Sequence, residues 1–168
     1  FPDRRLIRNE REIALCEEMV GSRITSFQSN RVCPFRCTFC AEYTVTGKFN
    51  RTTNPIRQRD PNDLLDEIEW VHAEYGLDSF KFCDATWNVS PEHVISFCEA
   101  KIERAITLPW ECNVHAGLAS EEMFHWMKKA NCHQMNVGCE SGSPRILKSI
   151  RKGISVESIV RVFDWARA

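Results

Sequence analysis

The order of the expected strands and helices limits the fold of this chain more than any other feature of its sequence. Four short segments have the pattern of strands, and each is followed by a longer helical pattern. The strands are expected at residues 23–28, 78–84, 110–114 and 134–139. Strands separated by helices of this length cannot pair as hairpins, so they should form a parallel sheet with right-handed crossovers. The sequence therefore predicts an α/β fold, either part of a β/α barrel or a doubly wound sheet.

Capping residues bound the helical patterns. In the first pattern, Asp60 is expected as the N-cap, Pro61 takes the first helical position, and Gly76 lies past the end. Further helices are expected over residues 90–105, 120–131 and 143–153, and from Ser155 onward. Together with the strands, these helices make up four βα units.

The carboxyl ends of the expected strands indicate where a ligand would bind. In both candidate architectures, ligands occupy the crevice at those ends. The loop after the first strand carries a group of cysteines, and polar or thiol residues end the other three strands. These residues are Cys83, Asp84 and Thr86, then Asn113 and His115, and finally Cys139, Glu140 and Ser141. We expect all of them to lie around one rim.

Composition and charge argue against several classes of protein. The chain has 168 residues, enough for one domain with a core, and its formal net charge of -1 gives no bulk attraction to nucleic acid. No apolar run approaches the roughly 20 residues of a membrane span. Nine cysteines, mostly scattered in apolar stretches, are typical of a reducing compartment, so we expect the cytoplasm. The start at Phe1 and the stop at Ala168 inside a helical pattern indicate a piece of a longer protein.

The stretch RVCPFRCTFC, residues 31–40, carries Cys33, Cys37 and Cys40. Thiolates at such short spacing suit zinc or an iron–sulfur cluster. A structural zinc site needs four ligands, but a second cysteine pair is missing and no histidine precedes His72. Three ligands spaced Cys-x3-Cys-x2-Cys instead suit a 4Fe–4S cluster in which one iron has no protein thiolate. We therefore predict these three cysteines as the metal ligands.

This spacing, with the aromatic Phe39 just before the last cysteine, resembles the signature of the radical S-adenosylmethionine (radical SAM) enzymes. The resemblance covers roughly residues 20–168. It implies a partial (β/α) barrel of six units, of which about four would be present in this chain. It also divides the chain into an N-terminal linker or helix, residues 1–20, and a radical SAM core, residues 21–168, truncated on its C-terminal side.

The resemblance implies a specific chemistry. The open iron would bind the amino and carboxylate groups of S-adenosylmethionine. The reduced cluster would cleave this molecule to methionine and a 5'-deoxyadenosyl radical, which abstracts a hydrogen atom from a substrate that the sequence does not identify. An electron donor such as flavodoxin or ferredoxin is an implied partner. Neither a nucleic-acid partner nor a membrane span is expected.

Individual residues are carried over from matching segments. VGCESGSPRILKSIRKG, residues 137–153, resembles the strand-four segment of the cobalamin-associated and methylthiotransferase-like branches. It implies that Glu140 contacts the ribose hydroxyls, that the neighbouring Ser141 also binds cofactor, and that Lys152 lies near the methionyl carboxylate. Phe39 would be a neighbour of the adenine.

The strand-two ending, FKFCDATW at residues 80–87, resembles the same branches and implies that Asp84 points at the cofactor's amino end. Two departures concern the neighbouring segments. The strand-two segment has no Gly-Gly-Glu, the commoner motif for the amino group. The third strand ends in CNVHAG, without the arginine that many relatives place near His115.

The segments PDRRLI, RQRDPNDLLDEIEW and GCESGSPRIL look most like the cobalamin-associated branch. Enzymes of this branch carry a cobalamin domain before the barrel, so cobalamin becomes a candidate cofactor of the parent protein. Methyl transfer, ring formation and sulfur insertion all remain open as the reaction. The resemblance thus leads to a radical SAM enzyme, with a cobalamin-dependent methyltransferase or cyclase as the subtypes considered.

Simpler explanations compete with this reading. The chain could be an iron–sulfur electron-transfer protein without SAM chemistry, or a zinc-stabilised binding module. Glu140 could be an acid favoured by a helix N-terminus, Lys152 a basic residue of a last helical turn, and Asp84 a cap of a turn. His115 could be a satisfied polar residue of the rim. A basic run is expected to be a solvated loop; it comprises Arg51, Arg57 and Arg59.

Overall fold

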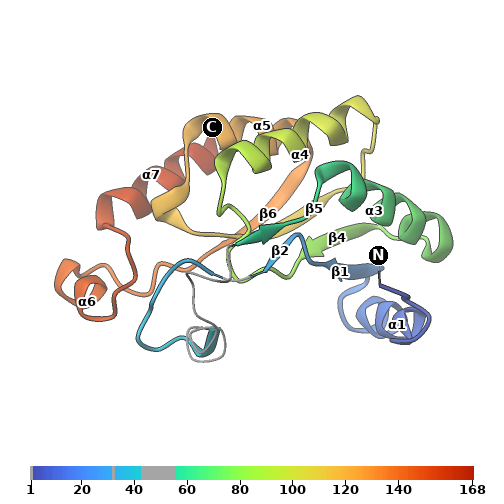
Figure 1. Cartoon of the computed structure of the whole chain (residues 1–168), viewed down its shortest axis with the longest axis horizontal. Coiled ribbons are helices and arrows are strands. Elements are labelled where there is room, and N and C mark those ends of the chain that lie inside the picture. Colours follow the sequence, from blue (N-terminus) through green and yellow to red (C-terminus); the bar gives the residue numbers. More distant parts are fainter. Residues whose placement is uncertain (1, 32, 43–55) are drawn as a thin grey trace.

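The main sheet consists of parallel strands in the order β1-β4-β5-β6 (Figure 1). The computed structural model describes residues 2–31, 33–42 and 56–168. The strands are β1 Ile24–Phe27, β4 Ser79–Phe82, β5 Trp110–Val114 and β6 Cys132–Val137. All neighbouring strands pair in parallel, as the spacing of strands and helices predicts, with one register shift between Trp110 and Glu111 where β5 pairs with β6.

The helices decide between the two candidate architectures. They are α1 Asn9–Val20, α3 Pro61–Tyr75, α4 Pro91–Glu103, α5 Glu121–Lys129, α6 Pro144–Ser149 and α7 Val156–Arg167, with a 3-10 turn η1 Ala116–Leu118. Figure 1 shows α3, α4, α5 and α7 on the same side of the sheet, where adjacent helices contact one another. The strand order also follows the sequence without reversal. A doubly wound sheet would reverse its order and cover both faces, so this sheet is a segment of a β/α barrel.

The helix boundaries confirm most of the capping predictions. The Asp60 carboxylate accepts hydrogen bonds from the backbone N–H groups of Asn62 and Asp63, and Gly76 ends α3 with a left-handed φ of 62°. Ser90 caps α4 and Ser120 caps α5 in the same way. These starts were predictable because a cap depends only on residues within one turn.

Two elements differ from the sequence prediction. Helix α6 ends at Ser149 instead of continuing to residue 153, because the chain turns at Arg151, where φ is 55°. Lys152 therefore lies beyond the helix and not in its last turn. A short antiparallel ribbon of β2 Asn30–Arg31 and β3 Arg57–Gln58 was not foreseen, since its two strands lie far apart in the sequence.

A cluster of aromatic side chains forms the centre of the core between the sheet and its helices. Phe82 lies within it, with ring centroids 5.3 Å from Trp87, 5.2 Å from Phe97 and 5.8 Å from Trp110. Edge-to-face and offset contacts of this kind add to the free energy gained by burying the rings. The cluster ties β4 to β5 and to α4.

The N-terminal segment packs against this core. Ile13 of α1 is fully buried in the same hydrophobic cluster. Arg4 is also buried, and its Nη2 lies 2.7 Å from Oε1 of Glu67 on α3. The segment expected as a linker or helix thus contributes side chains to the folded unit. In the three described ranges, no helix is both long and apolar enough to cross a membrane.

Replacing Phe82 by Ala is expected to lower the free energy of unfolding by about 3–5 kcal/mol, because a buried ring is lost and a cavity remains. Urea unfolding of the variant measures the loss. Val160→Ala serves as the control, since Val160 is 53% exposed and its truncation should change stability by about 0.5 kcal/mol at most. Equal losses in the two variants would contradict the central place of the aromatic cluster.

Candidate functional site

A cavity of about 530 Å³ opens at the carboxyl ends of β4, β5 and β6. Its size is in the range of small-molecule sites. Four residues predicted for the rim line it together: Thr86, Asn113, His115 and Glu140. Lys152, expected near the methionyl carboxylate, lines it as well. The other predicted rim residues, Cys83, Asp84, Cys139 and Ser141, do not line it. The carboxyl-end rule therefore located the cavity but not all of its wall.

An ion pair forms one side of this cavity. Lys152 Nζ donates a hydrogen bond of 2.9 Å to Oε1 of Glu140. Gly138 lies directly beneath, since a Cβ at this position would lie 2.7 Å from Lys152 Nζ and 2.9 Å from Glu140 Oε1. The absence of a side chain at Gly138 thus makes room for the pair. Glu140 itself has a left-handed φ of 56°.

His115 connects the cavity to the turn after α6. Its Nδ1 accepts a hydrogen bond from the Gly117 N–H, so the ring proton is on Nε2, which donates to the Lys152 carbonyl at 3.0 Å. The Asn88 side chain bonds both backbone groups of His115. The pKa of His115 is lowered to about 4, mainly by burial; the bond to the Lys152 carbonyl opposes this shift, and the nearby Lys152 charge adds to it. The imidazole is therefore neutral near pH 7.

The cysteine loop is attached to the edge of the cavity. The Phe35 ring stacks on His115, with centroids 3.5 Å apart and an interplanar angle of 11°. Phe35 also lies so close to Gly153 that a Cβ there would be 3.1 Å from the ring. The Thr38 N–H donates to the Ile150 carbonyl at 3.0 Å. These contacts hold the loop between β5 and the turn that follows α6.

The three predicted metal ligands lie on this loop. Cys33 Sγ is 3.3 Å from the Thr86 hydroxyl, which belongs to the cavity wall. Burial raises the pKa of the Cys37 thiol, the positive charge of Lys152 lowers it, and neighbouring Cys33 and Cys40 raise it. Each of these thiols is therefore close enough to influence the next.

The donor set at this loop is one of sulfur atoms. All nine cysteines are thiols and none forms a disulfide. Among the described residues, no group of three or more His, Cys, Asp or Glu side chains converges as ligands of a single metal ion would. Three soft thiols fit an iron–sulfur cluster, because thiolates are its usual ligands, and the Lys152 charge near Cys37 favours the thiolate form of that residue.

Phe39 lies beside the lysine of the ion pair. The residue is 55% exposed, and Lys152 Nζ is 6.0 Å from its ring centroid. An exposed aromatic face next to the cysteines is compatible with the predicted contact to an adenine, which stays a prediction.

The hydrogen-bond partners of Asp84 fit the simpler of the two roles considered from the sequence, that of a residue that caps a turn. It is 1% exposed, and it accepts hydrogen bonds from the N–H groups of Ser29 and Asn30 and from the Ser29 hydroxyl. Burial raises the pKa of its carboxyl, and these hydrogen bonds oppose the rise. Because both oxygens bind the backbone leading into the cysteine loop, Asp84 caps that turn and holds the loop's start.

Ser141 lies in the turn that leads into α6. Its hydroxyl accepts a hydrogen bond of 3.1 Å from the Ser143 N–H, and its own N–H donates to the Cys139 carbonyl. In the part of the chain described, this side chain supports the turn next to Glu140 and does not line the cavity.

Three contributors to the site were missed by the sequence reading: Phe35, Asn88 and Gly138. Gly138 had a local signal, because a glycine directly before a site carboxylate indicates a close approach. Phe35 and Asn88 had none, since their partner His115 is distant in the sequence. Of the basic run, only Arg59 departs from the expected solvated loop, because it forms ion pairs with Asp63 and Glu67. Arg57 is exposed, and Arg51 lies outside the described residues.

A family model described as the radical SAM superfamily matches residues 27–168 of this chain. The match begins at the last residue of β1 and includes the cysteine loop and every later element. It thus covers most of the chain.

Curated relatives match over most of this chain as well. An uncharacterized methyltransferase of Pyrococcus horikoshii is 28% identical over 139 residues, which is 83% of this chain and 29% of that protein. An anaerobic magnesium-protoporphyrin IX monomethyl ester cyclase of Rubrivivax gelatinosus is 29% identical over 136 residues, which is 80% of this chain and 23% of that protein. The chain therefore spans less than a third of the length of these relatives.

The fold also resembles solved structures. The radical S-adenosylmethionine methyltransferase TsrM of Kitasatospora setae, with cobalamin and a 4Fe–4S cluster bound, matches with a TM-score of 0.73 and 21% sequence identity. The match covers 87% of this chain and 29% of that one. At this level of identity the likeness is one of fold, and it agrees with the predicted partial barrel.

His115 should make the stability of the protein depend on pH. Its pKa is about 4 in the folded protein against an ordinary 6.5, so the unfolded chain takes up the proton first. The stabilisation is complete above pH 6.5 and is lost as the pH falls toward 4, by on the order of 3 kcal/mol. Urea unfolding of wild type and His115→Gln between pH 4 and 7 measures this difference.

The exposed His133 provides the control. His133→Gln should follow the pH dependence of the wild type, whereas His115→Gln should lose much of it. A His115→Gln curve parallel to that of the wild type would mean that the imidazole is not held neutral.

Proposed function

The chain belongs to the radical SAM superfamily, and on that premise we propose that Cys33, Cys37 and Cys40 hold a 4Fe–4S cluster that cleaves S-adenosylmethionine reductively. When bound, the cluster would supply the electron that breaks a carbon–sulfur bond of this molecule, giving methionine and a 5'-deoxyadenosyl radical for hydrogen abstraction. The observation that carries the proposal is the attachment of the cysteine loop to the edge of the carboxyl-end cavity.

The residues of the cavity have roles that suit S-adenosylmethionine. Lys152 would provide a positive charge for the methionyl carboxylate. Glu140 would accept from the ribose hydroxyls, and its Oε2 has no partner within the described ranges while Oε1 bonds Lys152. Phe39 would present an aromatic face to the adenine.

The remaining predicted cofactor residues would act through the backbone. Asp84 holds the start of the cysteine loop through Ser29 and Asn30, and so positions the cluster ligands. Ser141 would position Glu140 through the turn before α6. The neutral His115 would keep Phe35 and the Lys152 carbonyl in place.

The reaction of the whole protein is proposed from its relatives. Methyl transfer and ring closure are the two subtypes that the names of the relatives support. Because TsrM carries cobalamin, we include cobalamin as a cofactor of the full-length protein, outside this chain. The substrate is a small molecule or peptide of unknown identity, with flavodoxin or ferredoxin as the electron donor and the cytoplasm as the compartment. Residues 1–20 would precede a core of residues 21–168.

An iron–sulfur electron carrier without SAM chemistry is the second candidate. Its cluster would need four protein ligands and no nucleoside cavity. The carboxyl-end cavity with its Glu140–Lys152 pair favours the SAM enzyme.

Reconstitution provides the decisive test. The full-length protein, loaded anaerobically with iron and sulfide and reduced with dithionite, is expected to convert S-adenosylmethionine to 5'-deoxyadenosine and methionine. Cys37→Ala should lose cluster and product together, because one of three thiolate ligands is removed. Cys16→Ala, a half-buried cysteine of α1, should retain both. Iron analysis, visible absorption and chromatography of the products are the measurements.

Two outcomes would contradict parts of this proposal. A normal cluster without any deoxyadenosine or methionine would leave the electron carrier as the better description. A full 4Fe–4S complement in Cys37→Ala would refute the ligand assignment.

Gly138→Ala tests the Glu140–Lys152 pair. The new methyl group would displace the flexible ends of both side chains, so the pair should shift while the fold stays stable. We expect about tenfold weaker binding of S-adenosylmethionine, the loss of one charge-assisted hydrogen bond, with little change in melting temperature. Isothermal titration of the reconstituted protein measures the affinity.

Gly142→Ala is the matched control, because a Cβ at Gly142 meets nothing within 4 Å. It should bind S-adenosylmethionine as the wild type does. Unchanged affinity in Gly138→Ala would remove the pair from the proposed binding site.

A further inference from the structure

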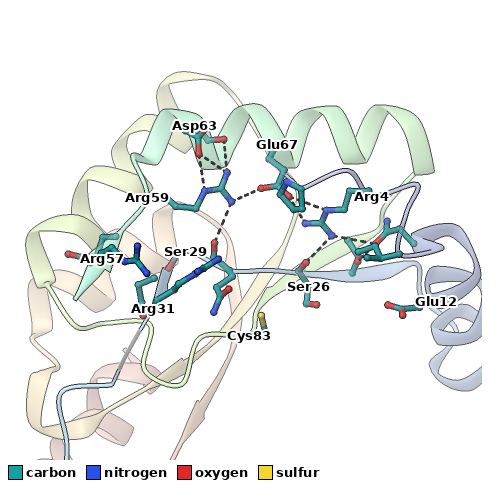
Figure 2. A pocket seen from close by; sticks show the side chains of 17 residues that line it. Arg4, Glu12, Ser26, Ser29, Arg31, Arg57, Arg59, Asp63, Glu67 and Cys83 are labelled. Carbon is teal, nitrogen blue, oxygen red and sulfur yellow. Dashed lines mark hydrogen bonds and ion pairs between the residues drawn. The ribbon is translucent and has the colours of Figure 1, made fainter. Parts of the chain in front are cut away.

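A second cavity of about 740 Å³ lies beside β1, between α1, the β2–β3 ribbon and α3 (Figure 2). It shares no lining residue with the carboxyl-end cavity. Its volume is that of a small-molecule site. Ser29 and Asn30 of its wall also hold Asp84, but none of the roles proposed above places a ligand in this cavity.

Part of its wall is a closed network of charges. Figure 2 shows Arg59 between Asp63 and Glu67 of α3, with Arg4 on the other side of Glu67. Arg59 Nη2 lies 2.6 Å from Asp63 Oδ2, and its Nη1 lies 2.5 Å from Glu67 Oε2. Arg4 Nη2 lies 2.7 Å from Glu67 Oε1. These two arginines and two carboxylates form ion pairs with one another. Their charges balance, so this part of the wall does not attract a further charge.

Within the described residues, two more arginines of the wall have no carboxylate partner. Arg31 of β2 and Arg57 of β3 are paired directly opposite each other in the antiparallel register, and both are exposed. Like charges in this position repel. Among described residues, no carboxylate forms an ion pair with either, and residues 1, 32 and 43–55 contain no Asp or Glu. An anion from outside this chain would relieve the repulsion.

The cavity also has hydrogen-bond donors that find no acceptor among the described residues. Asn9 is 1% exposed, and its Oδ1 accepts from Arg4 and Thr25, which fixes the orientation of the amide because Arg4 can only donate. Its Nδ2 is then a buried donor with no partner in the described structure, as is Nε2 of Gln58. Both residues line the cavity. Unpaired buried donors indicate that a ligand or water supplies acceptors here.

We propose that this second cavity binds a small molecule bearing a phosphate group, with the phosphate between Arg31 and Arg57 and other acceptor oxygens of the molecule at Asn9 and Gln58. The charge favours phosphate over carboxylate. Two unpaired guanidinium groups match the charge of a phosphate monoester, about -1.5 to -2 at pH 7, and each can bind it through two N–H groups. The proposal holds whether or not the chain performs radical chemistry.

The test uses the full-length protein without iron and two probes, inorganic phosphate and ribose 5-phosphate, with binding followed by isothermal titration and ³¹P line broadening. Ribose 5-phosphate should bind more tightly than phosphate alone, because the sugar can reach the amide donors. Arg31→Gln and Arg57→Gln should each weaken binding about tenfold to a hundredfold, the effect of one lost charge-assisted contact. Arg145→Gln, another exposed arginine without a partner in the described structure, should bind as the wild type does.

Two measurements on variants distinguish loss of the binding site from loss of the fold. Without phosphate, Arg57→Gln should melt at the same temperature as the wild type or higher, since it relieves the repulsion. Asn9→Asp keeps the oxygen that binds Arg4 and Thr25 but replaces the donor by a charged acceptor, so it should abolish binding of ribose 5-phosphate in a folded protein.

Three results would overturn the proposal. These are no binding of either probe, equal losses in Arg57→Gln and Arg145→Gln, and acetate binding as tightly as phosphate. The last would assign the cavity to carboxylates. Failure of the deoxyadenosine test would leave this result untouched, because the apoprotein is used.

Discussion

The buried carboxylate of Asp84 fixes the point at which the cysteine loop leaves the sheet. It lies just past the end of β4 yet binds the backbone of Ser29 and Asn30, directly before the loop. A carboxylate held this way is costly to move, because its hydrogen bonds cannot be replaced by water in the interior. The position of the three cysteines relative to the sheet therefore depends on these hydrogen bonds between the end of β4 and the start of the loop.

The remaining contacts place the cysteine loop against one wall of the site. Phe35 stacks on His115, and His115 bonds the carbonyl of Lys152, whose amine bonds Glu140. The chain of contacts runs from the cysteine loop through the end of β5 to the turns on either side of α6. On the outer side of β1, the ribbon that begins just before the loop closes a second, basic cavity. The same short segment therefore takes part in two sites.

Much of the fold could be predicted because its signals are local. Caps at Asp60, Ser90 and Ser120 depend on neighbours within one helical turn, and parallel pairing follows from the length of the connections. The end of α6 was predicted too far along the chain, because the left-handed turn occurs at Arg151 and not at a glycine, which would have indicated it. The contact expected between Asp84 and the cofactor stays a prediction. The hydrogen-bond partners of this carboxylate, Ser29 and Asn30, lie at the start of β2, far away in the sequence, so no local pattern could identify them.

By itself, the sequence determined the class of the fold, the cysteine spacing and the family, because each of these depends on residue type and on distance along the chain. The tertiary structure alone decided that Phe35 meets His115, that Gly138 leaves room for an ion pair, and that Arg31 faces Arg57. These contacts join segments that are distant in sequence or depend on side-chain packing in three dimensions. Periodicity and propensity act over a few residues and contain no information about such pairs.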